Sequence, residues 1–213
     1  LPYRWFLSRH LVDEIWVQSD FVFNAFKKLT KNVIKIPFYI ETSYIKGFSR
    51  THLKIPENKF IFLFTFDFLS SYERKNPEAV VKSFVEAFGA KDDVYLLIKT
   101  VNADKDFKKK KRFEHYVKGL TNVEFRDIFL TKDEQLGLIK SSDCYVSLHR
   151  SEGLGLAMAE AMSFGKPVIA TNYSGNLEFM NAENSFLVDF KLVSLSNESY
   201  IYGGNQVLSL IHI

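Results

Sequence analysis

Residues 144–171 read CYVSLHRSEGLGLAMAEAMSFGKPVIAT, and their pattern decides the fold class. The stretch begins with one short apolar run, CYVSLH (144–149), and ends with another, PVIAT (167–171). Short apolar runs bounded by turn residues are typical of buried strands. The intervening GLGLAMAEAMSFG (153–165) is rich in Ala, Leu and Met, which favour helix. Strand, helix and strand in this order predict one βαβ unit.

The same alternation extends along the chain from residue 59. Three further apolar runs are each followed by a helical pattern: KFIFLFTFDF (59–68) by 76–89, VYLLIKT (94–100) by 105–120, and VEFRD (123–127) by 131–142. Strands with nearly continuous apolar sequence are buried on both faces, so helices must cover both sides of a parallel sheet. The predicted fold class is therefore α/β, a doubly wound, Rossmann-like parallel sheet.

The first forty residues hold a separate strand, helix and strand pattern, at DEIWVQS (13–19), FVFNAFKKL (21–29) and NVIKIPFYI (32–40). We interpret this pattern as the last βα unit of a preceding domain, followed by the crossing into the next one. The predicted organisation is a tail of a preceding Rossmann-like domain with its linker at 1–34, and a second Rossmann-like domain at 35–213.

Composition indicates a soluble globular protein: 213 residues, 46% hydrophobic, with a net charge of +3. A single cysteine, Cys144, excludes a disulfide framework and favours a reducing compartment, so the expected location is cytoplasmic. No apolar run reaches membrane-spanning length, and residues 1–10 lack the pattern of a signal peptide. Because the sequence does not begin with Met, we expect it to be a piece of a longer chain.

Much of the lysine excess lies in one local stretch, Lys105–Lys118, which contains the run Lys108–Arg112. A solvated helix face is the main interpretation of this run, and peripheral association with an anionic membrane surface is the alternative. The small net charge predicts no nucleic-acid partner. Asp104 and Asp106 have the spacing of a metal-binding pair, but they introduce the lysine-rich helix and are interpreted as its start. Without a His and Cys cluster, no metal is expected.

Two acidic residues follow the strand at 144–149, where a parallel sheet binds its ligands. Glu152 precedes the helix that Gly153 and Gly155 are expected to open, and helix amino termini attract anions. Helix capping is the alternative role for Glu152. Glu160 lies among small and apolar residues, and a buried acid needs a partner or a ligand. On a continuous helix the two α-carbons would lie about 10–12 Å apart, which is too far for a retaining glycosidase pair.

The pattern Glu152-Gly153-Leu154-Gly155-Leu156, then Glu160-Ala161-Met162 and Gly165–Thr171, resembles the Glu-x7-Glu motif of family 4 (group 1) retaining glycosyltransferases. The resemblance covers roughly residues 10–190. It implies a GT-B fold, in which 35–213 is the C-terminally truncated domain that binds the nucleotide-sugar donor and 1–34 is the tail of the acceptor domain. It also implies that Glu152 holds donor-sugar hydroxyls at the catalytic end, Glu160 the ribose hydroxyls, and the Gly153–Leu156 backbone the sugar and diphosphate.

Further donor-site residues follow from the same resemblance. Arg74 and Lys75, expected at the start of a helix with Pro77 in its first turn, would reach the diphosphate, with solvated surface charge as the alternative. This loop departs from the family pattern, because Phe66-Asp67-Phe68 replaces Gly-Arg and Asn76 replaces a Gly. The remaining candidates are backbone groups of Gly175 and Asn176 for the diphosphate, backbone near Ile128 for the base, and His149, which contacts the donor or packs as a neutral ring.

These expectations define an enzyme that transfers a sugar from a nucleoside-diphosphate sugar to an acceptor saccharide, lipid or protein with retention of configuration. The nucleotide sugar is a substrate, and no cofactor is expected. The isolated piece is expected to be inactive, since a GT-B site needs both domains. A non-catalytic nucleotide-sugar binding module is the alternative. An NAD-dependent domain is disfavoured, because Met158 stands where the dinucleotide fingerprint needs a small residue.

Overall fold

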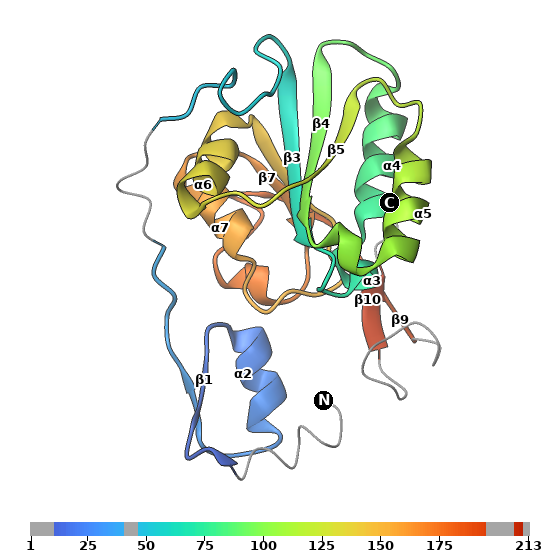
Figure 1. The fold of residues 1–213 in the computed structure, drawn as a ribbon. Helices are drawn as coiled ribbons and strands as arrows, with labels where there is room; N and C mark the ends of the chain where they lie inside the picture. Colours follow the sequence, from blue (N-terminus) through green and yellow to red (C-terminus); the bar gives the residue numbers. More distant parts are fainter. Residues whose placement is uncertain (1–10, 41–46, 195–206, 211–213) are drawn as a thin grey trace.

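The computed structural model describes residues 11–40, 47–194 and 207–210. Its centre is a six-stranded, fully parallel sheet in the order β5-β4-β3-β6-β7-β8 (Figure 1). The strands are β3 (Phe60–Asp67), β4 (Val94–Val101), β5 (Val123–Asp127), β6 (Cys144–Ser147), β7 (Val168–Thr171) and β8 (Phe186–Val188). The order reverses between β3 and β6, as in a doubly wound sheet. The predicted fold class is confirmed.

Helices cover both faces of this sheet (Figure 1). The long helices are α4 (Pro77–Phe88), α5 (Phe107–Val117), α6 (Lys132–Ser141) and α7 (Leu156–Ser163), with short helices α3 (Tyr72–Lys75), η2 (Ala103–Lys105) and η3 (Gly175–Glu178) between them. Successive residues of a strand point to opposite faces. In β3, Phe64 and Phe66 therefore pack toward α4 and α5, whereas Ile61 and Leu63 pack toward α6 and α7.

The helix starts follow local capping chemistry. Asp106 accepts a hydrogen bond from the Lys109 N–H, which confirms the interpretation of Asp104 and Asp106 as the start of α5. Thr131 and Glu134 form a capping box at the start of α6. Pro77 occupies the first turn of α4, as expected.

Two sequence-based expectations about the loops were wrong. Arg74 and Lys75 lie in the one-turn helix α3, because Asn76 adopts a left-handed conformation with φ of 55° and separates α3 from α4. Helix α7 begins at Leu156 and not at Gly153, because Gly155 has φ of 91° and cannot continue a right-handed helix. Glu152 is therefore outside the helix, and the rise per residue does not measure its distance from Glu160.

Residues 15–35 form a small parallel β1-α2-β2 unit, with β1 (Ile15–Val17), α2 (Asp20–Lys27) and β2 (Val33–Lys35). Ser19 caps α2, and its side chain accepts a hydrogen bond from the Val22 N–H. The predicted domain boundary after residue 34 falls within β2, and where the folding units divide stays a prediction. A further antiparallel pair joins β9 (Lys191–Ser194) to β10 (Val207–Leu210).

The β1-α2-β2 unit contacts the carboxyl-terminal end of the large sheet. The Ser19 hydroxyl donates to the Gly153 carbonyl oxygen at 2.5 Å, and the Asp20 N–H donates to Glu178 at 2.9 Å. Lys35 forms an ion pair with Glu178 at 2.7 Å, and the Phe21 and Tyr173 rings meet edge to face. These contacts place α2 directly beside the loops that follow β6 and β7.

Candidate functional site

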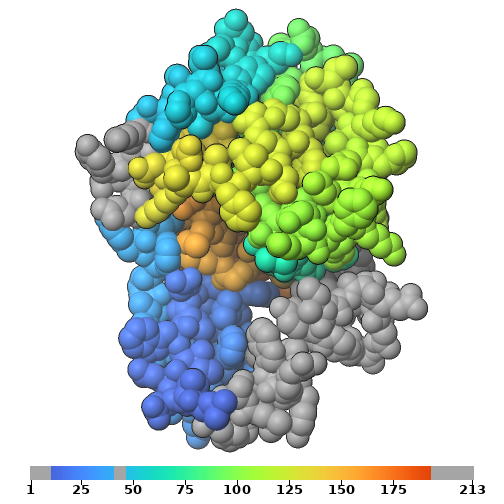
Figure 2. All heavy atoms as spheres, viewed as in Figure 1, coloured from blue at the N-terminus to red at the C-terminus, as the bar shows by residue number. Residues whose placement is uncertain are grey.

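A cavity of about 980 Å³ lies between the β1-α2-β2 unit and the carboxyl-terminal ends of β3, β4 and β6. The starts of α6 and α7 complete its wall. In Figure 2 the hollow opens between the blue atoms of the β1-α2-β2 unit and the yellow atoms of the α6 region. Its position at the strand ends is where an open parallel sheet binds ligands. The segment Gly153–Met158 and the side chains of Glu152 and Lys75 belong to its lining.

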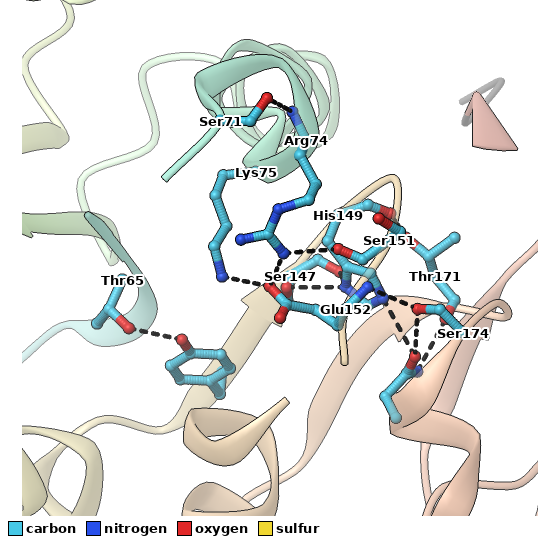
Figure 3. A network of polar contacts seen from close by, with 12 residues as sticks. Thr65, Ser71, Arg74, Lys75, Ser147, His149, Ser151, Glu152, Thr171 and Ser174 are labelled. Carbon is cyan, nitrogen blue, oxygen red and sulfur yellow. Dashed lines mark hydrogen bonds and ion pairs between the residues drawn. The ribbon is translucent and has the colours of Figure 1, made fainter. Parts of the chain in front are cut away.

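Glu152 is the centre of a compact charged cluster (Figure 3). Its carboxylate forms ion pairs with Lys75 and, at 3.1 Å, with Arg74, and its side chain is only 13% exposed. Arg74 also donates to the Ser151 carbonyl oxygen at 2.8 Å, which fixes α3 against the loop after β6. Burial alone would raise the pKa of the Glu152 carboxyl, but Lys75 and Arg74 outweigh it and hold this pKa below its ordinary value. The cluster thus joins one carboxylate to two cations at the cavity wall.

The loops that follow β6 and β7 pack closely against each other. The Gly175 N–H donates to the Glu152 carbonyl oxygen at 2.9 Å, and the Ser174 hydroxyl accepts from the Glu152 N–H at 2.8 Å. A Cβ at Gly175 would collide with the Gly153 carbonyl group, so only glycine fits there. Gly175 and Asn176 are buried and are not part of the cavity lining. They pack against the side of the Glu152 loop that faces away from the cavity, where Gly175 contacts Glu152 and Asn176 contacts His149.

His149 is fully buried beneath this loop and is not part of the lining either. Its Nε2 lies 3.2 Å from the Tyr173 carbonyl oxygen and 3.1 Å from Asn176 Oδ1, and its Nδ1 lies 3.0 Å from the Ser147 hydroxyl. Nδ1 also lies 3.1 Å from the Ser147 carbonyl oxygen, so both ring nitrogens face oxygen atoms, and the neutral ring carries its proton on one of the two. Burial lowers the pKa of His149, so the ring is neutral at pH 7.

We expect the His149 ring to stay neutral through the pH range in which an ordinary histidine titrates, about 6.5. A base whose pKa is lowered by folding destabilises the folded state below its ordinary pKa, because the unfolded chain binds the proton first. His149→Gln should therefore unfold at lower temperature than the wild type at pH 8, and the gap should narrow as pH falls below 6.5. NMR titration of the ring checks the protonation directly. A ring that titrates normally would contradict the buried neutral state.

Glu160 lies on α7 and is half-buried. Among the residues that the structure describes, no hydrogen bond or ion pair reaches its carboxylate. Burial raises the pKa of this carboxyl, and Lys132 on the neighbouring helix α6 offsets part of the effect. Glu160 is not part of the cavity lining, although Lys132 is. A buried acid without a partner is costly, which is the property that the sequence pattern predicted for it.

The other predicted residues are divided between the cavity and its surroundings. The lining includes Gly153, Leu154, Gly155 and Leu156. Ile128, which is 37% exposed directly after β5, is not part of it. Arg74 is not part of the lining either, but it forms an ion pair with Glu152, which is.

Sequence reasoning missed Lys99 and Gln135, which both line the cavity. Lys99, in β4, is only 8% exposed, and burial lowers the pKa of its amino group. Gln135 belongs to the first turn of α6, and its Oε1 is buried with no hydrogen-bond partner within 11–40, 47–194 and 207–210. The sequence did contain a signal for Lys99, which is its place within the apolar run VYLLIKT. A lysine is rarely buried unless it is paired, so a lysine in a buried strand indicates a partner or a ligand.

In the described part of the chain, no group of three or more His, Cys, Asp or Glu side chains is placed to hold a metal ion. Among helices within 11–40, 47–194 and 207–210, none combines the length and apolarity needed to cross a lipid bilayer.

Residues 46–198 match the protein family described as Glycosyl transferases group 1. The chain belongs to this family. No curated protein sequence matches the chain significantly. Solved structures of glycosyltransferases share the fold of this group 1 glycosyltransferase chain at low sequence identity.

Three of these solved structures illustrate the similarity. Anabaena HepE in complex with UDP and glucose is 19% identical with a TM-score of 0.69, over 86% of this chain and 51% of that one. Sucrose-phosphate synthase from Thermosynechococcus elongatus is 22% identical with a TM-score of 0.65, over 84% and 45%. The C-terminal domain of the Francisella tularensis group 1 protein LpcC is 23% identical with a TM-score of 0.56, over 68% and 76%. The chain thus spans about half the length of the Anabaena protein.

Proposed function

We propose that this chain supplies the donor site of a family 4, retaining glycosyltransferase that takes its sugar from a nucleoside-diphosphate sugar. The observation that carries the proposal is the Glu152 cluster with Lys75 and Arg74, at the wall of a large cavity at the strand ends of a group 1 glycosyltransferase fold. HepE, which has a similar fold, is known in complexes with UDP and glucose and with UDP-glucose. The acceptor, a saccharide, lipid or protein, is not assigned.

The charged cluster accounts for how a diphosphate would be bound. Without ligand, Glu152 forms ion pairs with both Lys75 and Arg74, and its single negative charge leaves these three side chains with a net positive charge. A diphosphate is a stronger anion with more acceptor oxygens, and Arg and Lys bind phosphate well. On binding, the diphosphate would take over both cations, and the Glu152 carboxylate would be freed to accept hydrogen bonds from hydroxyls of the donor sugar. Glu160, whose carboxylate has no partner among the described residues, would accept from the ribose hydroxyls.

We expect the chain to bind UDP or GDP with the same affinity in the presence and absence of EDTA. The reason is that Lys75 and Arg74 provide the positive charge that a divalent cation would otherwise provide. Isothermal titration calorimetry with both nucleotides checks this expectation. Loss of binding on addition of EDTA would contradict metal independence, and no binding of either nucleotide would contradict the donor site itself.

Transfer is tested on the full-length protein. Product formation from a nucleoside-diphosphate sugar distinguishes an enzyme from the alternative, a non-catalytic nucleotide-sugar binding module. The anomeric configuration of the product, read by NMR, tests retention.

A further inference from the structure

Lys99 is a buried cation that lines the cavity. It is 8% exposed, and among the described residues no acceptor lies within hydrogen-bond distance of its amino group. The nearby carboxylates are already engaged: Asp127 accepts from Thr100 and from the Ala103 N–H, and Asp67 accepts from Asn102 and the Leu69 N–H. A desolvated ammonium group is costly unless it donates to an acceptor. The cavity that Lys99 lines is the place from which such an acceptor would come.

A second unsatisfied group lines the same cavity. Gln135 Oε1 is buried, and no described residue donates a hydrogen bond to it, so turning this amide toward a ligand breaks none of the described hydrogen bonds at that oxygen. Lys99 points to the α6 and α7 face of the sheet, because it alternates with Leu97, which packs there. Gln135 lies in the first turn of α6, the helix that packs on that face. The Lys99 amino group of β4, which donates hydrogen bonds, and the Gln135 side-chain oxygen of α6, which accepts them, therefore lie on the same wall of the cavity.

This wall is distinct from the Glu152 cluster. In the sheet β4 is separated from β6 by β3, so the end of β4 lies on the order of 10 Å from the end of β6. Lys99 pairs in register with Arg126 of β5 and with Thr65 of β3. Lys75 and Arg74 already supply cations for a diphosphate at the Glu152 end. The cavity extends from Glu152 past the end of β3 to Lys99 and Val101 of β4, so a nucleoside diphosphate bound to these cations has room to extend its base toward β4.

We propose that Lys99, with Gln135, selects the base of the donor nucleotide, and that it selects a keto base, uracil or guanine, over an amino base. This inference rests on the proposed donor site. A protonated lysine only donates hydrogen bonds, so it matches the O4 of uracil or the O6 of guanine. Next to that oxygen both bases carry a ring N–H, which an amide oxygen such as that of Gln135 accepts. Cytosine and adenine carry an amino group at this position instead. Because the amino group and the Lys99 ammonium are both donors, neither finds an acceptor in the other.

The test compares matched nucleotide pairs, UDP with CDP and GDP with ADP, by calorimetry on the wild type, Lys99→Met and Lys82→Met. Lys82 is an exposed residue of α4 that pairs with Glu86 away from the cavity, and it controls for the loss of one positive charge. The expected result is a preference of roughly tenfold to a hundredfold for the keto base in one of the pairs. Lys99→Met should remove most of this preference by weakening the keto nucleotide, and Lys82→Met should retain it.

Melting temperatures exclude misfolding as the cause, because replacing a buried unpaired cation by an apolar side chain should stabilise Lys99→Met. Binding of all four nucleotides without preference would overturn the base assignment and leave the donor site standing. Lack of binding by all four would overturn both. If Lys99→Met weakened inorganic pyrophosphate as much as UDP, Lys99 would be a phosphate ligand, and the base assignment would be wrong.

Discussion

Glu152→Gln is expected to lower the free energy of unfolding by about 3 kcal/mol at neutral pH, the typical cost of removing one partner of a buried ion pair. The carboxylate is 13% exposed and serves both Lys75 and Arg74, which are themselves largely buried. A neutral amide would leave two cations without a counter-charge. Urea unfolding of the wild type and variant measures the difference. Glu86→Gln, an exposed i,i+4 position on α4, is the matched control and should change stability little.

The destabilisation by Glu152→Gln should depend on pH. Because folding holds the pKa of this carboxyl below its ordinary value, the carboxylate stabilises the protein above the ordinary glutamate range, and the contribution is lost as pH falls through the lowered pKa. The wild type and variant should therefore converge in strong acid. A stability difference that does not change with pH would contradict a charge-based role.

Ligand affinity separates this structural effect from a role in binding. Glu152→Gln should weaken binding of the sugar nucleotide, because the carboxylate proposed to accept from the sugar hydroxyls is lost. It should not weaken binding of the nucleoside diphosphate, because in the variant Lys75 and Arg74 do not have to give up an ion pair with Glu152 to bind it. Calorimetry with UDP and UDP-glucose, or with the GDP pair, gives both affinities. Equal losses for both ligands would refute the assignment of Glu152 to the sugar.

Glu160→Gln should have the opposite effect on stability. Its carboxylate is half-buried and has no partner in the described part of the chain, and burial raises its pKa, so the ionised form is unfavourable in the folded protein. A neutral amide should raise the melting temperature at pH 7. The gain should shrink as pH falls through the raised pKa, because the wild-type carboxyl then becomes neutral as well. A lower melting temperature at pH 7 would show that the carboxylate has a stabilising partner.

The same substitution should weaken the nucleoside diphosphate and the sugar nucleotide alike. Loss of a hydrogen bond to a charged acceptor costs about 1.5–3 kcal/mol, or roughly tenfold to a hundredfold in affinity. A variant that is more stable yet binds less well would assign Glu160 to a ligand, whereas a purely structural residue would not separate the two properties. Unchanged affinity for both ligands would exclude the ribose role.

Much of the fold could be predicted from local pattern. The apolar runs of β3, β4 and β6 and the helical patterns between them predicted the parallel sheet, because strand and helix periodicity is a property of neighbouring residues. The spacing of Glu152 and Glu160 likewise indicated the family. The loop conformations could not be predicted: the left-handed backbone at Asn76 and Gly155, which displaced two helix boundaries, depends on how each loop packs against the rest of the chain.

By itself, the sequence determined the fold class and the group 1 family, because these depend on residue types at short and regular spacings. The ligand roles of Glu152 and Glu160 stay predictions. Only the tertiary structure decided which side chains meet. Lys75 contacts Glu152 across 77 positions of the chain, and Lys99 of β4 lines the same cavity as Gln135 of α6. Such encounters depend on strand order and on the face to which each side chain points. Electrostatics are decided at the same level, since burial and neighbouring charges shift the pKa values of Glu152 and Glu160 in opposite directions.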